Sequence, residues 1–179
     1  MKKIIWVCGV IAGIISVAWG VLSDNVLGDS LSLHTKLILG YATMILGFSL
    51  IFVAIKNYRD TQNNGQISFG KALVIGLWIT LIASTVYVVI WMIDFSYFIP
   101  DFGDKYQAQA VAEMKANGVS AAEIQKQAAE MATTMARYKS SAVFRAMFTY
   151  FEITPIGIVV SLIAALILKK NTKEATANI

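Results

Sequence analysis

The chain has 179 residues, of which 57% are hydrophobic and 15% charged, and its net charge at pH 7 is +4. A soluble domain carries about 25% charged residues, so this composition cannot supply a water-facing surface for a globular domain. One cysteine and one histidine, Cys8 and His34, exclude an intramolecular disulfide and the usual multi-cysteine or multi-histidine metal sites. Basic residues are not interleaved with stacking aromatics on one face, so we expect no nucleic acid partner.

Four apolar stretches are each long enough to cross a lipid bilayer as a helix, which takes about 20 residues. The first three contain no charged residue. Backbone groups in lipid must be satisfied within the protein, and these stretches lack the alternation of barrel strands. The sequence therefore predicts an all-α membrane protein, a four-transmembrane-helix bundle forming one domain over residues 1–179, with spans at about 4–22, 37–55, 72–93 and 146–168.

The first apolar stretch also has features of a signal peptide. Lys2 and Lys3 precede it, and Ser16 and Ala18 are small residues of the kind found at cleavage sites. However, the apolar run continues to Leu22, which is longer than a typical signal core. We therefore expect this stretch to be retained as the first membrane span.

The distribution of basic residues predicts the orientation of the spans. The connection between the first two spans carries Lys36 beside Asp24 and Asp29, whereas the other flanks are strongly basic. Because basic residues collect on the cytoplasmic side, we expect both termini and the loop at 56–71 in the cytoplasm. The basic residues on the predicted cytoplasmic side are Lys2, Lys3, Lys56, Arg59, Lys71, Lys169, Lys170 and Lys173.

Small residues recur at a spacing of four in every predicted span, which allows helices to approach closely in lipid. We expect these stripes to pack the four helices against one another within one chain. The alternative is a homodimer that uses a spare stripe of the first span. The stripes consist of Gly9 and Gly13; Ala12, Ser16 and Gly20; Thr43 and Gly47; Ala72, Gly76, Thr80 and Ser84; and Gly157, Ser161 and Ala165.

The segment at 104–139, between the third and fourth spans, is predicted to form an extracytoplasmic amphipathic helical hairpin. Pro100 ends the third span, and Gly118 ends the first hairpin helix at a glycine cap. Ser120 and Glu123 then form a capping box for the second helix. We expect the hairpin to lie on the outer mouth of the bundle or to bind an envelope protein. The apolar face of the second helix consists of Ile124, Ala128, Met131, Met135 and Tyr138.

Glu152 is a carboxylate well inside the fourth predicted span, on its outer half, and Pro155 follows three positions later. A charge at mid-membrane costs about 2.5 to 3.5 kcal/mol, so such a residue is a candidate functional site. Helical spacing places Arg145 and Thr149 on the same face, and we expect Arg145 to reach towards the carboxylate. Polar residues at matching depth on the other spans complete the candidate site: Ser16, Tyr41, Thr43, Thr85 and Tyr87.

Two interpretations of Glu152 stay open. In the functional one, the carboxylate binds a proton or a cationic ligand in a cavity that the Pro155 kink opens between helices. In the structural one, it is a satisfied polar group that fixes helix packing near the proline.

Catalytic motifs were also sought in the sequence. The run Gly47–Leu50 resembles the nucleophile turn of intramembrane serine proteases, but His34 lies about 22 Å away at 1.5 Å per helical residue, which is too far for a dyad. The chain has no glycine-rich phosphate loop and no di-histidine motif. We therefore predict no enzymatic activity, no catalytic or metal site, and no cofactor.

Several segments resemble a bacterial membrane family called domain of unknown function 4199. The resemblance implies a four-span bacterial inner-membrane protein, and it brings neither an activity nor site residues. The segments that carry it are Leu50–Asp60, Ile67–Ala72, Ile99–Phe102, Pro155–Gly157 and Ser161–Ala165.

Two functions remain as hypotheses. The leading one is a non-enzymatic inner-membrane protein whose outer segment at 104–139 engages an envelope partner or supports the envelope. The alternative is a small transporter or proton-linked carrier centred on Glu152, acting as a homodimer because four spans enclose little volume.

Overall fold

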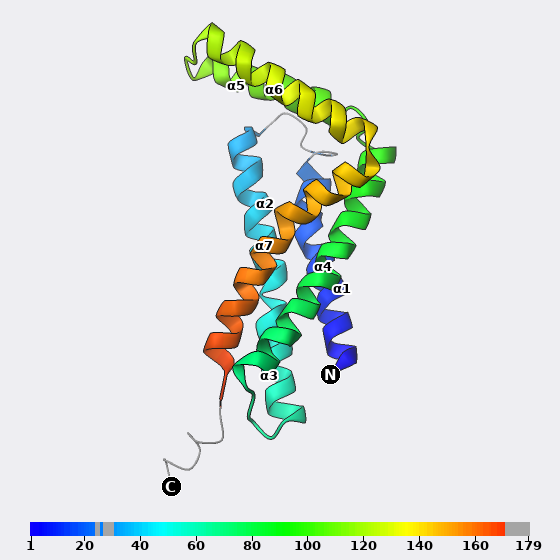
Figure 1. Cartoon of the computed structure of the whole chain (residues 1–179), viewed down its shortest axis with the longest axis vertical. Helices are drawn as coiled ribbons and strands as arrows, with labels where there is room; N and C mark the ends of the chain where they lie inside the picture. The colour runs from blue at the N-terminus through cyan, green and yellow to red at the C-terminus, as the bar shows by residue number, and fades with distance from the viewer. Residues whose placement is uncertain (24–25, 27–30, 171–179) are drawn as a thin grey trace.

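The computed structural model describes residues 1–23, 26 and 31–170, and these residues form a long helical bundle with a helical pair lying across one end (Figure 1). Four helical stretches in the described residues are long and apolar enough to cross a membrane, as the sequence predicts. The helices are α1 (Lys2–Leu22), α2 (Leu33–Phe48), α3 (Leu50–Gln62), α4 (Phe69–Tyr97), α5 (Phe102–Ala116), α6 (Ala121–Ser140) and α7 (Ala142–Leu168). Asp24, Asp29 and Lys173, which contribute to the predicted orientation, lie outside the described residues.

The second predicted span consists of two helices, α2 and α3, which follow one another end to end through Ser49. The Ser49 hydroxyl donates a hydrogen bond to the Leu46 carbonyl oxygen at 2.6 Å, and the Phe52 N–H donates to the Ser49 carbonyl oxygen at 3.0 Å. Serine hydroxyls that bond to the preceding turn compete with the helical ladder and bend helices. The two helices together form one stretch of 30 residues, Leu33–Gln62, long enough to cross a membrane, with a local irregularity at Ser49, whose φ of −58° and ψ of −23° stay helical.

Small residues bring the helices of the bundle into close contact. A Cβ atom added at Gly13 in α1 would lie 2.6 Å from the carbonyl oxygen of Ala83 in α4. A Cβ atom added at Gly47 in α2 would likewise lie 2.6 Å from the carbonyl oxygen of Ala12 in α1. These spacings leave room for hydrogen only, so the glycines set the distances between α1, α2 and α4.

Both small-residue stripes of α1 are used inside the chain. Gly9 faces Ile82 of α4 next to Gly13, while Ser16 lies beside Gly47 of α2 and is 2% exposed. The structure thus supports packing within one chain and leaves no spare stripe on α1. The packing therefore does not favour a homodimer through a small-residue stripe of the first span, which the sequence left as an alternative.

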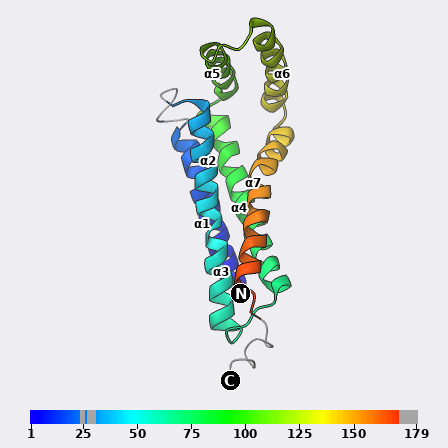
Figure 2. The same ribbon diagram turned by 90° about the vertical axis from the view of Figure 1, so that its left-hand side faces the viewer.

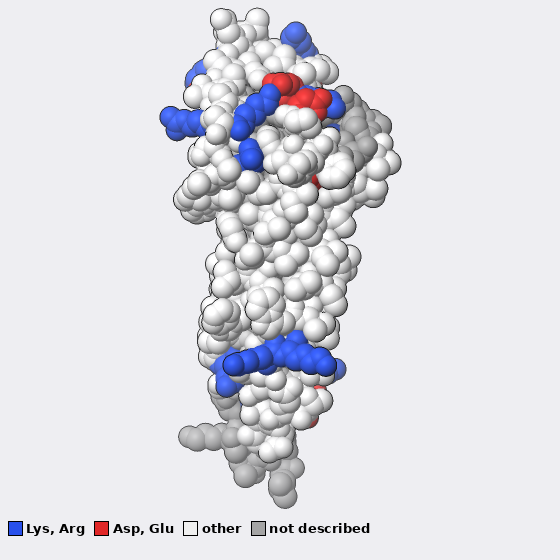
Figure 3. Space-filling view, turned by 90° about the vertical axis from the view of Figure 1, so that its right-hand side faces the viewer, with Lys and Arg blue, Asp and Glu red and all other residues white. Residues whose placement is uncertain are grey.

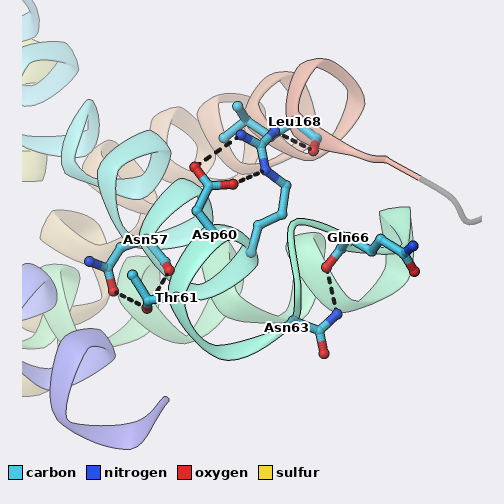
Figure 4. A network of polar contacts seen from close by, with 7 residues as sticks. Asn57, Asp60, Thr61, Asn63, Gln66 and Leu168 are labelled. Carbon is cyan, nitrogen blue, oxygen red and sulfur yellow. Dashed lines mark hydrogen bonds and ion pairs between the residues drawn. The ribbon is translucent and has the colours of Figure 1, made fainter. Parts of the chain in front are cut away.

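The end of the bundle that carries the N-terminus, which we call the basal end, is held together by polar contacts (Figure 4). Arg59 near the end of α3 donates a hydrogen bond to the carbonyl oxygen of Leu168 at 3.3 Å, and it pairs with Asp60 at 2.7 Å. Ile67 and Lys170 exchange backbone hydrogen bonds of 3.0 and 2.8 Å. These contacts fix the end of α7 against α3 and the loop before α4.

Charged residues lie towards the two ends of the molecule. On the face drawn in Figure 3, basic residues collect near the basal end and around the α5–α6 pair, and the long stretch between them is uncharged. Large apolar side chains such as Leu46, Trp78 and Ile167 are exposed on this stretch of the bundle, at 61%, 54% and 66%. An exposed apolar surface of this extent is what a lipid-facing surface requires.

A glycine turn joins α5 to α6. Gly118 has φ of 73°, and the N–H groups of Gly118 and Val119 donate to the carbonyl oxygens of Lys115 and Met114, both at 3.1 Å. This is the hydrogen-bond pattern of a glycine cap. The Ser120 hydroxyl then accepts from the Glu123 N–H at 3.3 Å, which begins α6. The two helices lie alongside each other and across the end of the bundle (Figure 2).

Candidate functional site

A cavity of about 830 Å³ lies between α1, α2, α4 and α7, under the α5–α6 pair. Its volume falls in the range of sites that bind small molecules, which is about 300–1,000 Å³. The cavity exists because α2 and α7 meet near the middle of the bundle, where Gly157 packs against Phe48, and diverge towards α5 and α6 (Figure 2).

Aromatic side chains form much of the cavity wall, and they come from four different helices of the bundle. Glu152 supplies the carboxylate among the described residues that line the cavity. The lysines Lys36 and Lys105 lie in the lining on the side of the α5–α6 pair. The aromatic residues of the bundle that line it are Trp19, Tyr41, Tyr87, Trp91, Phe148 and Phe151.

Glu152 lines the cavity, and its side chain is exposed. Within the described part of the chain, its carboxylate accepts no hydrogen bond and forms no ion pair. A carboxylate at this depth that has no protein partner is available to a ligand, a proton or water. The structural interpretation, a carboxylate satisfied by its neighbours, is therefore not supported.

Ser16 contributes a second polar group without a protein partner. Its side chain is 2% exposed and lines the cavity, and its Oγ atom has no hydrogen-bond partner among the described residues. The Oγ atom is fully buried and lies against Gly47 of α2, 2.5 Å from where an added Cβ atom would be, so the contact between α1 and α2 encloses it. The unpaired polar group that a ligand in the cavity can reach is therefore Glu152 on α7.

Arg145 does not approach Glu152, which corrects the sequence-based expectation. Its guanidinium group donates to the carbonyl oxygen of Tyr138 at 2.8 Å and lies over the ring of Phe95, 4.2 Å from its centre. The physical reason is that α6 ends beside the first turn of α7. The last carbonyls of α6 lack helical partners and attract a cation more closely than the carboxylate two turns further along.

Three of the predicted polar residues lie elsewhere. The Thr149 hydroxyl, 2% exposed, donates to the Arg145 carbonyl oxygen at 2.9 Å, and that of Thr43 donates to Gly40 at 2.8 Å. The Thr85 hydroxyl accepts a hydrogen bond from the Tyr150 hydroxyl at 2.9 Å. None of the three lines the cavity among the described residues. A threonine in a helix satisfies its hydroxyl on the preceding turn, so depth alone does not bring it to a site.

Other predicted residues do come together. Tyr87, Ser16 and Tyr41 line the same cavity as Glu152. Pro155 lies within α7, one turn beyond Glu152, and its missing N–H leaves the carbonyl oxygen of Phe151 without a helical partner. Four of the predicted residues therefore share one site, with Pro155 beside it.

The α5–α6 pair forms the roof of the cavity. Phe102 and Tyr106 of α5 and Met135 of α6 line the cavity. The indole N–H of Trp91 donates to the Tyr138 hydroxyl at 2.6 Å, and burial raises the pKa of Tyr138. The C-terminal part of the apolar face of α6, with Met135 and Tyr138, therefore faces the bundle. Its helical spacing was visible in the sequence, but which residues it would cover was not.

The α5–α6 pair is also joined to the start of α2. The N–H of Leu33 donates to the Glu113 carboxylate at 2.7 Å, and the Gln109 amide donates to the carbonyl oxygen of Leu31 at 2.8 Å. A carboxylate at a helix N-terminus is stabilised by the unpaired N–H groups there. The roof is thus held at both sides of the cavity, on α2 by these bonds and on α4 and α7 by the Trp91–Tyr138–Arg145 cluster.

One buried carboxylate, near the end of α4, was not among the candidates predicted from the sequence. Asp94, which lies just past the third predicted span, is 5% exposed and belongs to the last turns of α4. It is not part of the cavity lining among the described residues. No group of three histidine, cysteine or acidic side chains in the described residues is arranged to hold a metal ion.

Comparison with known proteins adds one match. The chain matches the family model described as "Protein of unknown function (DUF4199)" over residues 8–170. No curated protein and no solved structure matches it. Since the match covers nearly the whole chain, including the cavity and its roof, the protein belongs to the DUF4199 family.

Proposed function

We propose that the protein is a non-enzymatic, multi-pass inner-membrane protein that binds a small organic cation at Glu152. The observation that carries this proposal is the cavity of about 830 Å³ in which the Glu152 carboxylate has no protein partner. Such a site serves a carrier, which was the alternative function inferred from the sequence.

The orientation in the membrane is part of the proposal. The N-terminus, Arg59 and the end of α7 lie at the basal end, and the α5–α6 pair lies at the other (Figure 1). Basic residues with few acidic ones gather at the basal end, which favours the cytoplasmic side for that end. The cavity then opens in the outer half of the membrane with the segment at 104–139 outside.

The chemistry of the walls favours a cation over an anion or a neutral ligand. A negative charge in a low-dielectric cavity is strongly stabilised by an opposite charge. The faces of Trp and Tyr rings also attract cations, with about 0.5 to 2 kcal/mol per contact. Tyr87 and Trp91 lie in the lining together with Glu152. A proton on Glu152 is the competing occupant, so binding of the cation would release it, as in a proton-linked carrier.

Ligand-dependent stabilisation tests this function. Tetramethylammonium should raise the unfolding temperature of the purified wild-type protein, because a ligand at 100 times its Kd adds about 2.7 kcal/mol of stability. Glu152→Gln should remove this response while the protein stays folded. Glu130→Gln, on the exposed side of α6, is the matched control and should respond like the wild type. An equal response in the Glu152→Gln protein would rule out the proposed site.

A second function, binding of an envelope protein by the segment at 104–139, is favoured by a different observation. The side of α6 that faces away from the bundle carries exposed charged residues, including Lys126, Glu130 and Arg137. The C-terminal part of its apolar face is turned towards the bundle, so a partner there would meet a polar surface. Mild crosslinking in cells followed by purification should recover the partner, and replacement of these three residues by alanine should abolish the recovery.

A further inference from the structure

The cavity is open on its side, between α2 and α7. The lining residues on α1 and α4 are buried or half-buried, whereas several on α2 and α7 are exposed. On α2 these are Leu37 and Tyr41, at 53% and 39%, and on α7 they are Phe148 and Phe151, at 48% and 75%. Residues spaced by three or four lie on one face of a helix. The two exposed faces therefore border one slot, which we call the α2–α7 slot.

The two ends of the slot are closed. Towards the basal end, α2 and α7 meet where Gly157 packs against Phe48. Towards the other end, α5 covers the cavity with Phe102 and Tyr106, and Glu113 fixes it to α2. A molecule that reaches Glu152 by the most open route therefore passes between α2 and α7.

The residues at the slot are apolar or aromatic, and they lie in the part of the bundle that faces lipid in the proposed orientation. Phe151 precedes Glu152 directly and is among the most exposed aromatic side chains of the described residues. On the side of the roof, where water would have access, Phe102 and Tyr106 of α5 cover the cavity. Lipid at the slot is thus the more favourable source of a cationic ligand.

We propose that the ligand is an amphiphilic cation, with one ammonium group and an apolar chain, that reaches Glu152 laterally from the outer leaflet through the α2–α7 slot. This inference rests on the proposed function and adds the class of ligand and its route. The ammonium group pairs with Glu152. The aromatic walls hold the part of the chain next to it, and the rest extends between α2 and α7 into lipid. Each methylene of the chain that leaves water contributes about 0.8 kcal/mol to the free energy of binding, measured from the ligand in water.

Two cations with the same head group distinguish the ligand class. Dodecyltrimethylammonium and tetramethylammonium are titrated into protein in phosphatidylcholine nanodiscs, with empty nanodiscs as the control for partition into lipid. We expect the dodecyl compound to bind at least about 100-fold more tightly, equivalent to about 2.7 kcal/mol, and Glu152→Gln to weaken both. If the wild type binds the two cations with equal affinity and Glu152→Gln still loses binding of both, the proposed ligand class is wrong and the proposed function stands. Insensitivity of both to Glu152→Gln would instead overturn the proposed function.

Blocking the slot tests the route. In a Cys8→Ala background, Phe151→Cys and Ile163→Cys are each modified with a bulky maleimide. Ile163, 46% exposed on α7, is the matched control because it lies outside the cavity lining. The label at position 151 should slow the association of dodecyltrimethylammonium about tenfold or more, whereas the label at position 163 should not. An association rate that is unchanged by the label at position 151 would contradict lateral access.

Discussion

The half of the bundle near Leu168 and the half beneath the α5–α6 pair are built from the same helices, but the helices approach each other at different distances. In the basal half, glycines and small polar residues bring α4 and α7 together, as where Gly76 meets Ser161. In the other half, large aromatic residues such as Trp19 and Phe148 line the space between the helices. Tight packing at the basal end and divergence at the other create a cavity, which the α5–α6 pair covers.

This difference teaches that residue size places the site as much as charge does. Small side chains let helices touch in lipid, and close contact gives the dispersion energy that holds a membrane bundle together. Large rings hold the helices apart, and the space between them takes a polar molecule only where a group such as Glu152 offers a partner.

The closest helix contact in the basal half should tolerate the least change. A side chain at Gly157 would collide with Thr80 of α4 and Phe48 of α2. Gly157→Val should therefore destabilise the protein by about 1 to 3 kcal/mol through overpacking, measured by thermal unfolding in detergent. Gly40→Ala is the matched change in the open half, where the added Cβ atom meets Trp19 at 3.8 Å. It should leave stability unchanged or raise it, since alanine favours the helix. Equal losses in the two variants would remove the contrast between the halves.

Arg145 should be essential for holding the roof on the open half. Arg145→Met preserves much of the apolar volume but leaves the Tyr138 carbonyl oxygen without its donor, which costs about 1 to 3 kcal/mol. The rate of backbone amide hydrogen exchange should rise in the last turn of α6. Arg137→Met, at an exposed position of the same helix, should exchange like the wild type. Unchanged exchange in Arg145→Met would show that the roof is held by other contacts.

Tyr138→Phe tests the same roof, and we expect it to cause a smaller loss of stability. It removes the acceptor of the Trp91 indole N–H and should cost about 1 to 2 kcal/mol, measured by unfolding at neutral pH. Burial raises the pKa of Tyr138, so the folded state holds this proton more tightly than the unfolded chain. The contribution is present below the ordinary tyrosine pKa of about 10 and is lost as pH rises through the folded value. The difference in unfolding free energy between the wild type and Tyr138→Phe should therefore become smaller as the pH rises through that value. A difference that stays constant with pH would contradict this account.

The polar contact between α4 and α7 in the basal half should matter least. The Thr80 and Ser161 hydroxyls are 3.2 Å apart, and Ser161 also donates to the Gly157 carbonyl oxygen at 2.7 Å. Hydrogen bonds between membrane helices contribute about 0.6 kcal/mol on average, so Ser161→Ala should lower stability by about that amount in the same unfolding measurement. A loss as large as that of Gly157→Val would mean that polar contacts, and not close approach, hold the basal half.

Most of the fold could be predicted from the sequence. Span length and hydropathy found all four apolar helical stretches, and Gly118 and Ser120 marked the turn between α5 and α6. These signals are local, because each depends on neighbouring residues along one helix. The irregularity at Ser49 was not predicted, since serine within an apolar helix is compatible with both a straight and a bent course.

The site could be predicted only in part. Glu152 was found because an acid in an apolar span is costly, and Tyr87 because its depth matched. The prediction that the Arg145 side chain reaches towards Glu152 was wrong, because its orientation depends on where the last turn of α6 lies, which is a tertiary feature. The aromatic walls were not recognised, because Trp91 or Phe148 in a membrane span is equally consistent with contact to lipid. Which helices diverge depends on packing between distant segments, such as Gly157 against Phe48.

Solvent access inside the open half tests the central claim most directly. Tyr87 and Val88 are neighbours on α4 and are 6% and 5% exposed, but among the described residues only Tyr87 lines the cavity. In a Cys8→Ala background, Tyr87→Cys and Val88→Cys are treated in membranes with a small cationic thiol reagent. The account predicts rapid modification of Tyr87→Cys, slowed when Glu152 is replaced by Gln, and no modification of Val88→Cys. Failure to modify Tyr87→Cys, or equal rates at the two positions, would contradict an open cavity at Glu152.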